Sequence, residues 1–191
     1  MIASSARPAA ADRPGSGASQ SPRERILAAA RELFYRRGIH AVGVDAIAAC
    51  LIELTQEFDA AWNVIAAAHA GDPKGQLLAW LRHVCDFKEN EAARGCALAN
   101  AAVELPDMDH PARRVIREHK AAVRERLIGL CRDARLADPE RLADEILLIY
   151  EGARVTAQSV GSEGLSARLA GMIEALVSDH ARRGKRGALH R

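Results

Sequence analysis

Histidine, cysteine and acidic side chains are the residues of this chain that could bind a metal ion or catalyse a reaction. His83 and Cys85 are two positions apart, which places them on different faces of a helix. His110 and His119 also lack the spacing that brings two metal ligands together on one helical face. The sequence contains no glycine-rich phosphate loop and no GxSxG motif. We therefore expect no catalytic site, no metal, no cofactor and no enzymatic activity.

Large aromatic side chains are scarce, at 4% of the residues. Among many alanines they can belong to the core, or they can line a pocket for a small apolar or aromatic molecule between helices. Histidine, asparagine and glutamine side chains would supply the polar groups of such a pocket if they point inward. The candidate ligand-binding residues are Trp62, Trp80, His83, Phe87, Asn100, Tyr150 and Gln158.

The four cysteines are widely spaced and form no CxxC pair. Each lies in an apolar helical context, where a free thiol behaves as a small hydrophobic side chain. This usage favours a reducing compartment. Residues 1–22 have no apolar core of a signal peptide, and no apolar run in the chain has the length of a membrane span. We therefore expect a cytoplasmic protein.

The net charge of +2 conceals an uneven distribution of charged residues. Residues 51–180 carry 21 acidic and 15 basic side chains, whereas residues 181–191 carry 5 basic side chains and no acidic one. The basic C-terminal residues can contact phosphate groups, or they can form a tail that only increases solubility. Residues 1–20 are rich in Pro, Gly, Ser and Ala, which predicts a disordered N-terminal tail.

The elements that would position these residues are all helical. Apolar residues recur at intervals of three and four, and no alternating strand pattern is present, so the sequence predicts an all-α fold. The first helix begins at the capping box Ser21-Pro22-Arg23-Glu24 and ends at Gly38. The later helices are expected at about 44–70, 73–88, 96–105, 109–135, 139–161 and 162–180.

The segment expected to be helical at about 44–70 is unusually long. Apolar residues recur along it at alternating intervals of three and four from Val44 to Ile65, and no Gly or Pro interrupts Val44 to Ala70. Such a pattern is typical of one amphipathic helix. We therefore predict one unbroken helix from about Val44 to about Ala68.

The N-terminal part of the chain resembles a known family. The segment RERILAAARELFYRRGIHAVGVDAIA resembles the first helix and the start of the second helix of the TetR/AcrR transcription regulators. The segment GCALANAAVELPDMDHPARRVIREHK is similar to the middle of the ligand domain in one branch of that family. The resemblance covers most of residues 22–180. It implies a helix-turn-helix head, a helical effector-binding body, and a homodimer joined through the last two long helices.

One part of the family pattern is missing. The family continues with a Gly-containing turn, a recognition helix ending in Tyr-x-x-Phe, and a Lys that opens the fourth helix. This chain runs directly from Cys50 into LIELTQEFDAAW, which resembles the later part of that fourth helix. The expected organisation is therefore a tail (1–20), a truncated helix-turn-helix head (21–50), an effector-binding and dimerisation body (51–180) and a basic tail (181–191).

The truncation limits the DNA contacts that the resemblance implies. The absent helix would carry the base contacts, so the remaining head could contact only the DNA backbone. Candidate DNA-binding residues are Arg23, Arg25, Arg37 and Val44. The resemblance implies an effector-responsive repressor, and we expect no sequence-specific DNA binding by this chain. The alternative is a ligand-binding or heterodimerising helical module that does not bind DNA alone.

The last two helices carry apolar stripes together with small residues, which allow helices to approach closely. A two-fold, isologous homodimer is the expected assembly. The candidate dimer-interface residues are Leu142, Ile146, Ile149, Ala153, Ala157, Leu165, Leu169, Met172 and Ile173.

Overall fold

The fold consists of helices that meet at steep angles. The computed structural model describes residues 43–86 and 95–189. In chain order the helices are α2 (Val44–Ala68), α3 (Pro73–Cys85), α5 (Ala97–Glu104), α6 (Pro111–Asp133), α7 (Pro139–Val160) and α8 (Leu165–Leu189). The described residues contain no β-strand, so the predicted all-α fold is confirmed. Within the same ranges, no helix has the length and apolar character needed to cross a membrane. The helix expected at 22–38 lies outside the described residues.

Helix α2 is continuous over 25 residues, from Val44 to Ala68, as the sequence predicted. Its residues lack Gly and Pro, and its apolar positions form one face that is buried or partly buried from Ile47 to Ile65. The helix begins after Gly43, whose carbonyl oxygen accepts a hydrogen bond from the Ile47 N–H at 3.0 Å. It ends before Gly71, which has a φ of 79°, a conformation that glycine adopts without steric cost.

Three of the other helices begin with proline, which fits the first helical position because the N–H there has no helical partner. These prolines are Pro73, Pro111 and Pro139. At the start of α3 the Asp72 carboxylate also accepts a hydrogen bond from the Gly75 N–H at 2.9 Å. The Asp-Pro and His-Pro pairs therefore define these helix starts locally, close to the starts expected at about 73, 109 and 139.

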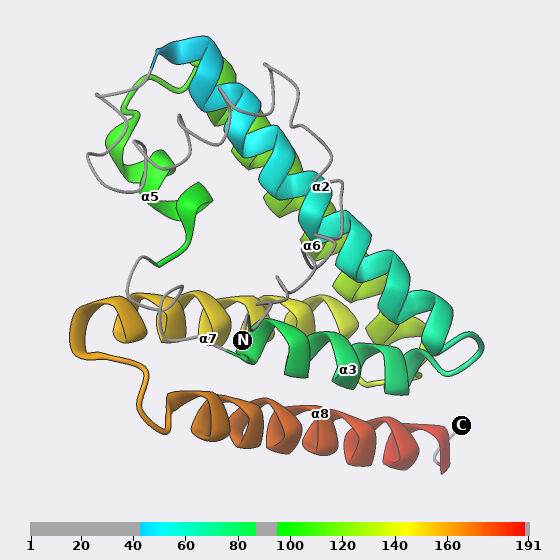
Figure 1. Cartoon of the computed structure of the whole chain (residues 1–191). Helices are drawn as coiled ribbons and strands as arrows, with labels where there is room; N and C mark the ends of the chain where they lie inside the picture. Colours follow the sequence, from blue (N-terminus) through cyan, green and yellow to red (C-terminus); the bar gives the residue numbers. More distant parts are fainter. Residues whose placement is uncertain (1–42, 87–94, 190–191) are drawn as a thin grey trace, which may run out of the picture.

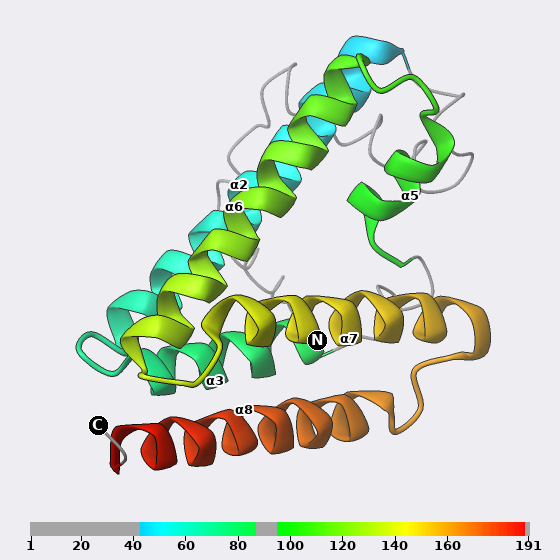
Figure 2. The same cartoon turned by 180° about the vertical axis from the view of Figure 1, so that it is seen from behind.

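The helices form a long arm above a layered base. Helices α2 and α6 lie side by side and make up the arm, while α7 and α3 cross its lower end (Figures 1 and 2). Helix α8 lies beneath α3 and α7 and packs against both. The short helix α5 lies above α7, on the side opposite the lower part of the arm, and packs against α6.

The larger hydrophobic core lies in the base and at the lower end of the arm. It joins α3, α6, α7 and α8 with the second half of α2. Its most completely buried large side chains include Trp80, Leu77, Leu127, Leu142, Ile146, Leu169 and Ile173. Each helix contributes an apolar face at helical spacing, so the base is stabilised mainly by removal of apolar surface from water.

A second, separate hydrophobic cluster lies at the upper end of the arm. Ile47 and Leu51 of α2 pack there with Leu98 of α5 and Ile116 of α6. Leu51 is only 1% exposed and Ile47 only 4%. The first turns of α2 are therefore packed against the body of the protein, and the boundary that we expected between residues 50 and 51 lies inside one helix and one cluster.

Three ion pairs link α6 to α7. The pairs are Lys120–Glu151, Arg124–Asp144 and Arg132–Glu140. Arg124 donates through Nε and Nη2 to both carboxylate oxygens of Asp144, at 2.6 and 3.0 Å, which is a bidentate geometry. The basic residues follow one another along α6 in the opposite order to their acidic partners along α7, as expected for two antiparallel helices.

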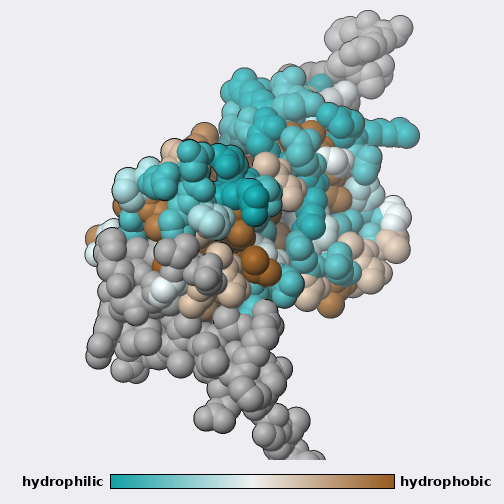
Figure 3. Space-filling model, turned by 90° about the horizontal axis from the view of Figure 1, so that it is seen from above, coloured by the Kyte–Doolittle hydropathy of each residue, from teal (hydrophilic) through white to brown (hydrophobic). Residues whose placement is uncertain are grey.

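Seen from above, the described surface is mostly hydrophilic, with small hydrophobic areas between polar residues (Figure 3).

Helix α8 is longer than predicted. We expected it to end near His180 and a basic tail to follow over 181–191, but the helical backbone continues to Leu189. Gly184 lies within this extension, and a Cβ atom added there would be only 2.8 Å from the Arg135 carbonyl oxygen. The glycine allows the loop after α6 to approach α8 closely.

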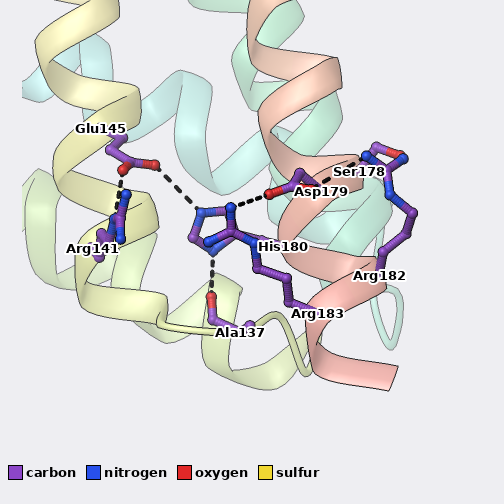
Figure 4. Close-up of polar contacts among 8 residues, drawn as sticks. All are labelled: Ala137, Arg141, Glu145, Ser178, Asp179, His180, Arg182 and Arg183. Atoms are coloured by element: carbon purple, nitrogen blue, oxygen red, sulfur yellow. Dashed lines mark hydrogen bonds and ion pairs between the residues drawn. The ribbon is translucent and has the colours of Figure 1, made fainter. Parts of the chain in front are cut away.

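His180 joins α8 to the rest of the base. Its side chain is 1% exposed and lies between α7 and the loop that precedes it (Figure 4). The Ala137 carbonyl oxygen can only accept, so Nδ1 of His180 donates the 2.5 Å hydrogen bond to it. Nε2 lies 3.4 Å from Oε2 of Glu145, and Arg141 donates from Nε to the other carboxylate oxygen, Oε1, at 2.7 Å. These contacts anchor the C-terminal half of α8.

Candidate ligand-binding site

A cavity of about 160 Å³ lies where the arm, the base and α5 meet. Five elements contribute to its wall, so the site depends on the packing of the whole body. Its lining residues are Leu54 and Phe58 of α2, Trp80 of α3, Cys96, Ala97 and Leu98 at the start of α5, His119, Lys120 and Val123 of α6, and Leu147, Tyr150, Glu151 and Arg154 of α7.

One side of the cavity is aromatic. Phe58 is its centre, with the Trp80 ring at 5.9 Å and the His119 ring at 4.9 Å between centroids, both nearly perpendicular to it. Trp62 lies behind this wall, 5.5 Å from Trp80, and the Arg126 guanidinium lies 5.5 Å from a Trp62 ring centroid. Edge-to-face packing of this kind holds aromatic rings in a defined orientation.

The polar lining residues lie mainly on α7. The Lys120 ammonium contacts the Glu151 carboxylate. Arg154 donates through Nη1 to the Tyr150 hydroxyl at 3.1 Å and through Nη2 to the Gly95 carbonyl oxygen at 2.7 Å. Gly95 has a φ of 68°, a conformation that favours glycine. The turn before α5 therefore places a carbonyl where the guanidinium can reach it.

Burial changes the proton equilibria of two lining groups. Loss of hydration, followed by the nearby Lys120 charge, lowers the pKa of His119 below its ordinary value of 6.5. Burial also raises the pKa of Tyr150 to about 12. At neutral pH the His119 ring is therefore uncharged, and the Tyr150 hydroxyl keeps its proton and can act as a hydrogen-bond donor.

Three of the residues predicted to bind a ligand lie at or near this cavity. Trp80 and Tyr150 line it directly. Trp62 is buried and contacts Trp80 and Phe58, but it forms a second layer behind the wall. The idea that the few large side chains gather in one place between helices therefore agrees with the structure, while ligand binding itself stays a prediction.

The predicted polar residues do not line this cavity. His83 is exposed on α3, because the buried face of that helix runs through Trp80, Leu81 and Val84. Asn100 is half-buried on α5 but is not part of the cavity wall. Gln158 is exposed and lies against Gly95. Phe87 lies outside the described residues.

The polar residues that do line the cavity were missed by the sequence analysis. They are His119, Lys120, Glu151 and Arg154. The sequence could have indicated Arg154 as a lining residue, since it is one helical turn after Tyr150 and follows the small residues Gly152 and Ala153. A charged side chain in such a stretch can point into a cavity that the small residues leave open.

The cysteines are placed much as their apolar surroundings predicted. Cys50, Cys85 and Cys131 are buried, and burial raises the pKa of the Cys85 thiol to about 11 and that of Cys131 to about 12. Cys96 is only partly buried and lines the cavity. In the part of the chain that the structure describes, no three His, Cys, Asp or Glu side chains gather as a metal site.

Most of the predicted dimer-interface residues belong to the core of the single chain. Leu142, Ile146, Ala153, Ala157, Leu169 and Ile173 are all 8% exposed or less, so a partner could not contact them without rearrangement. Ile149 and Leu165 are half-buried, and Met172 is 57% exposed. Exposed apolar side chains of α7 lie on another face, at Leu148 and Val155. The assembly itself stays a prediction.

The predicted DNA-binding residues lie at the edge of the described structure. Arg23, Arg25 and Arg37 lie outside the described residues, and Val44 is the first residue of α2. Their proposed contacts with the DNA backbone stay predictions.

Comparison with known proteins identifies the family. Residues 73–173 match the family described as tetracyclin repressor-like, C-terminal domain, and residues 26–50 match the bacterial regulatory proteins of the tetR family. No curated protein matches the sequence. A TetR-family transcriptional regulator from Streptomyces coelicolor superimposes with a TM-score of 0.73 at 22% identity, over 83% of this chain and 95% of that one. A protein from Streptomyces avermitilis, described as a tetR transcriptional regulator, gives 0.64 at 26% identity, over 85% and 99%. The C-terminal match covers more than half of the residues and the N-terminal match adds part of the regulator's head, so this chain belongs to the TetR family of transcriptional regulators.

Proposed function

We propose that this chain is the effector-binding and dimerising body of a TetR-family regulator, and that it has no sequence-specific DNA recognition of its own. The observation that carries the proposal is the fusion of the head remnant to the body. Residues that resemble the start of the second head helix continue without a break into α2, and Ile47 and Leu51 are buried against α5 and α6. We propose no catalytic role, and we expect the protein to act in the cytoplasm.

The position of this helix argues against a role in reading DNA bases. In a helix-turn-helix the first of the two helices crosses the DNA backbone, and the second enters the major groove with its N-terminal residues at the base edges. Here the helix that follows Gly43 has its apolar residues packed on the body from its first turns. The match to the tetR-family head also stops at Cys50, inside this helix. Both observations support the absence of a separate recognition helix.

The candidate DNA contacts of this chain are a small set of arginines, and the body next to them is acidic. Arg23, Arg25 and Arg37 could contact phosphates, but phosphate contacts carry no direct sequence information. Residues 51–180 carry a net charge of −6, which opposes approach to DNA. We therefore expect weak association that is strongly reduced by salt.

A competition assay tests this proposal. Labelled duplex from the DNA flanking the gene is bound to the protein at physiological salt and displaced by unlabelled copies of itself or by a random duplex of equal length. Specific regulators prefer their operator by roughly 10³-fold or more. We expect the two competitors to be equally effective, and a thousandfold advantage for the flanking sequence would contradict the proposal.

Dimerisation through α7 and α8 is the second part of the proposal. The two helices expose Leu148, Val155 and Met172, which are 74%, 59% and 57% accessible in the single chain. Their burial between two copies would remove apolar surface that a single chain leaves in water. Sedimentation at micromolar concentration should therefore give a dimer, and a monomer would count against this part.

The alternative function, heterodimerisation with a full-length relative, is supported by the same surface. A chain that keeps the dimerisation helices but lacks base recognition would form mixed dimers with a single complete head. Adding this chain to a full-length regulator bound at its operator should then release the DNA. No loss of the bound complex at excess of this chain would rule out this alternative.

A further inference from the structure

The cavity described above has the size of one small ring. Its volume is about 160 Å³. An apolar cavity of roughly 150 Å³ is large enough to hold a molecule of benzene. The space between the arm, the base and α5 is therefore suited to a ligand that consists of a single ring with one small substituent.

Three rings on one side of the cavity favour an aromatic ligand over an aliphatic one. Phe58 lies 5.9 Å from Trp80 and 4.9 Å from His119 between ring centroids, and both neighbours are nearly perpendicular to it. An inserted ring can meet their faces and edges in the offset or T-shaped geometry that aromatic pairs prefer. Trp80 is only 2% exposed and belongs to the larger core, so packing against that core holds the wall in place.

The charged groups of the lining already have partners within the protein. The Lys120 ammonium contacts the Glu151 carboxylate. The Arg154 guanidinium donates to the Tyr150 hydroxyl and to the Gly95 carbonyl oxygen, and it makes a further interaction. A charged ligand would lose its hydration on entering the cavity, and among the described lining residues each charge is already engaged. The arrangement therefore favours a ligand without a net charge.

Two neutral polar groups of the lining remain for a ligand. The Tyr150 oxygen accepts from Arg154 at 3.1 Å, and burial raises the pKa of Tyr150 to about 12, so the hydroxyl keeps a hydrogen that it can donate. Burial, followed by the Lys120 charge, lowers the pKa of His119, so at neutral pH its ring has one donor nitrogen and one acceptor nitrogen. Within the described ranges, the His119 ring packs on Phe58 and takes part in no hydrogen bond.

A hydroxyl group on the ligand matches both of these neutral groups, because it can accept from Tyr150 and donate to the His119 ring. From this juxtaposition we propose that the cavity binds a small, uncharged phenol. The aromatic ring of the ligand packs against Phe58 and Trp80, and its hydroxyl group faces Tyr150 and His119. The inference rests on the proposed function, because it names the ligand class of the proposed effector site. It does not depend on whether the chain binds DNA.

Phenol and toluene test the hydroxyl group, because the two molecules have nearly the same shape. Each is titrated into the full chain in a calorimeter at pH 7, where a phenolic hydroxyl is uncharged. Toluene would leave the Tyr150 hydrogen and the His119 ring nitrogen without a partner, so phenol should bind about tenfold or more tightly. Toluene binding as tightly as phenol would overturn the assignment of a hydroxyl group.

Two further pairs of probes test the preference for an uncharged ligand. Benzoate is compared with benzamide, and benzylamine with benzyl alcohol, so that each charged molecule has a neutral counterpart of similar size. Each charged member should bind about tenfold or more weakly than its counterpart, because the lining charges are already engaged by protein groups. A charged member that binds as tightly as its neutral counterpart would overturn the uncharged class.

Variants locate the hydroxyl group of the ligand. Tyr150→Phe removes the donor and keeps the ring, and His119→Leu removes the ring nitrogens. Each should reduce the preference for phenol over toluene, and the ratio of the two affinities cancels effects of the variant on ring packing alone. His83→Leu is a matched control, because His83 is exposed on α3 and lies outside the cavity wall. If one variant fails to fold, the other still tests the site. A preference that no folded variant changes would overturn the placement.

A fluorescence titration separates this inference from the proposed function. Binding of each probe can be followed through Trp62 and Trp80, the only two tryptophans of the chain. Toluene binding at millimolar concentrations with no binding of phenol would overturn the phenol class and leave an effector site for an apolar molecule. If none of the probes bound at these concentrations, both the ligand class and the proposed effector site would be wrong.

Discussion

Substitution of Leu51 by alanine should destabilise the whole protein, because this residue joins the head remnant to the body. Leu51 is 1% exposed and packs in the cluster formed with α5 and α6. Replacing a buried leucine by alanine costs about 2–5 kcal/mol, through lost burial and the cavity left behind. For a chain of this length each kcal/mol lowers the melting temperature by roughly 2–4 °C.

The neighbouring position supplies a control within the same turn of the helix. Ile52 is 43% exposed, and alanine is a better helix former than isoleucine, so Ile52→Ala should change stability by less than about 0.5 kcal/mol. The two variants differ in burial and share the same local backbone. The comparison therefore isolates the packing of α2 on the body from any effect on helix propensity.

Urea unfolding followed by two signals measures the effect. Far-ultraviolet circular dichroism reports on all helices, whereas tryptophan fluorescence reports on Trp62 and Trp80, which belong to the larger core. We expect Leu51→Ala to lower both transitions together, because the upper cluster and the core share α2 and α6. A fluorescence transition that is the same in Leu51→Ala as in Ile52→Ala would refute the integration of this segment into the body.

Three further predictions follow from the described contacts. Leu148→Glu combined with Val155→Glu should convert the dimer into a monomer in sedimentation. Val64→Glu, at an exposed side chain of α2, should leave the protein dimeric. A dimer that persists in the double variant would place the interface elsewhere. Burial and the Lys120 charge lower the pKa of His119 in the folded protein, so below pH 6.5 the unfolded chain binds more protons than the folded chain. The free energy of unfolding should therefore fall as the pH decreases from 6.5 towards the lowered pKa. His119→Gln should flatten that slope, and an unchanged slope would contradict the assignment. Cys85 and Cys131, whose thiol pKa values are raised to about 11 and about 12, should react with a thiol reagent only on unfolding, while Cys96 should react faster; equal rates for all three would contradict the packing.

The sequence predicted the local features of the fold more reliably than the partners of its side chains. The bounds of α2 followed from an unbroken apolar spacing and the lack of Gly and Pro, both of which are local properties. The end of α8 could not be read in the same way. We expected an end near His180, but the helix continues to Leu189, and Gly184 lies close to Arg135 of another element, a contact that no local pattern reveals.

The apolar stripes of the last two helices show the same limit. Ile146 and Ile173 were assigned to a dimer interface, yet both are buried in the core of the single chain. A periodic pattern reports that a face is buried but does not reveal whether the same chain or a second copy covers it. Likewise, Lys120 and Arg154 line the cavity because of how α6 and α7 are rotated against each other, which no local pattern determines.

Selection from a pool of randomised duplexes tests the central claim most directly, because it requires no knowledge of an operator. The full chain is incubated with the pool at physiological salt, and bound DNA is recovered, amplified and sequenced over several rounds. A protein without a recognition helix should enrich no motif, and its weak binding should decline steeply as salt is raised. Enrichment of a palindromic motif, with affinity exceeding that for random duplex by roughly 10³-fold or more, would contradict the loss of sequence-specific recognition.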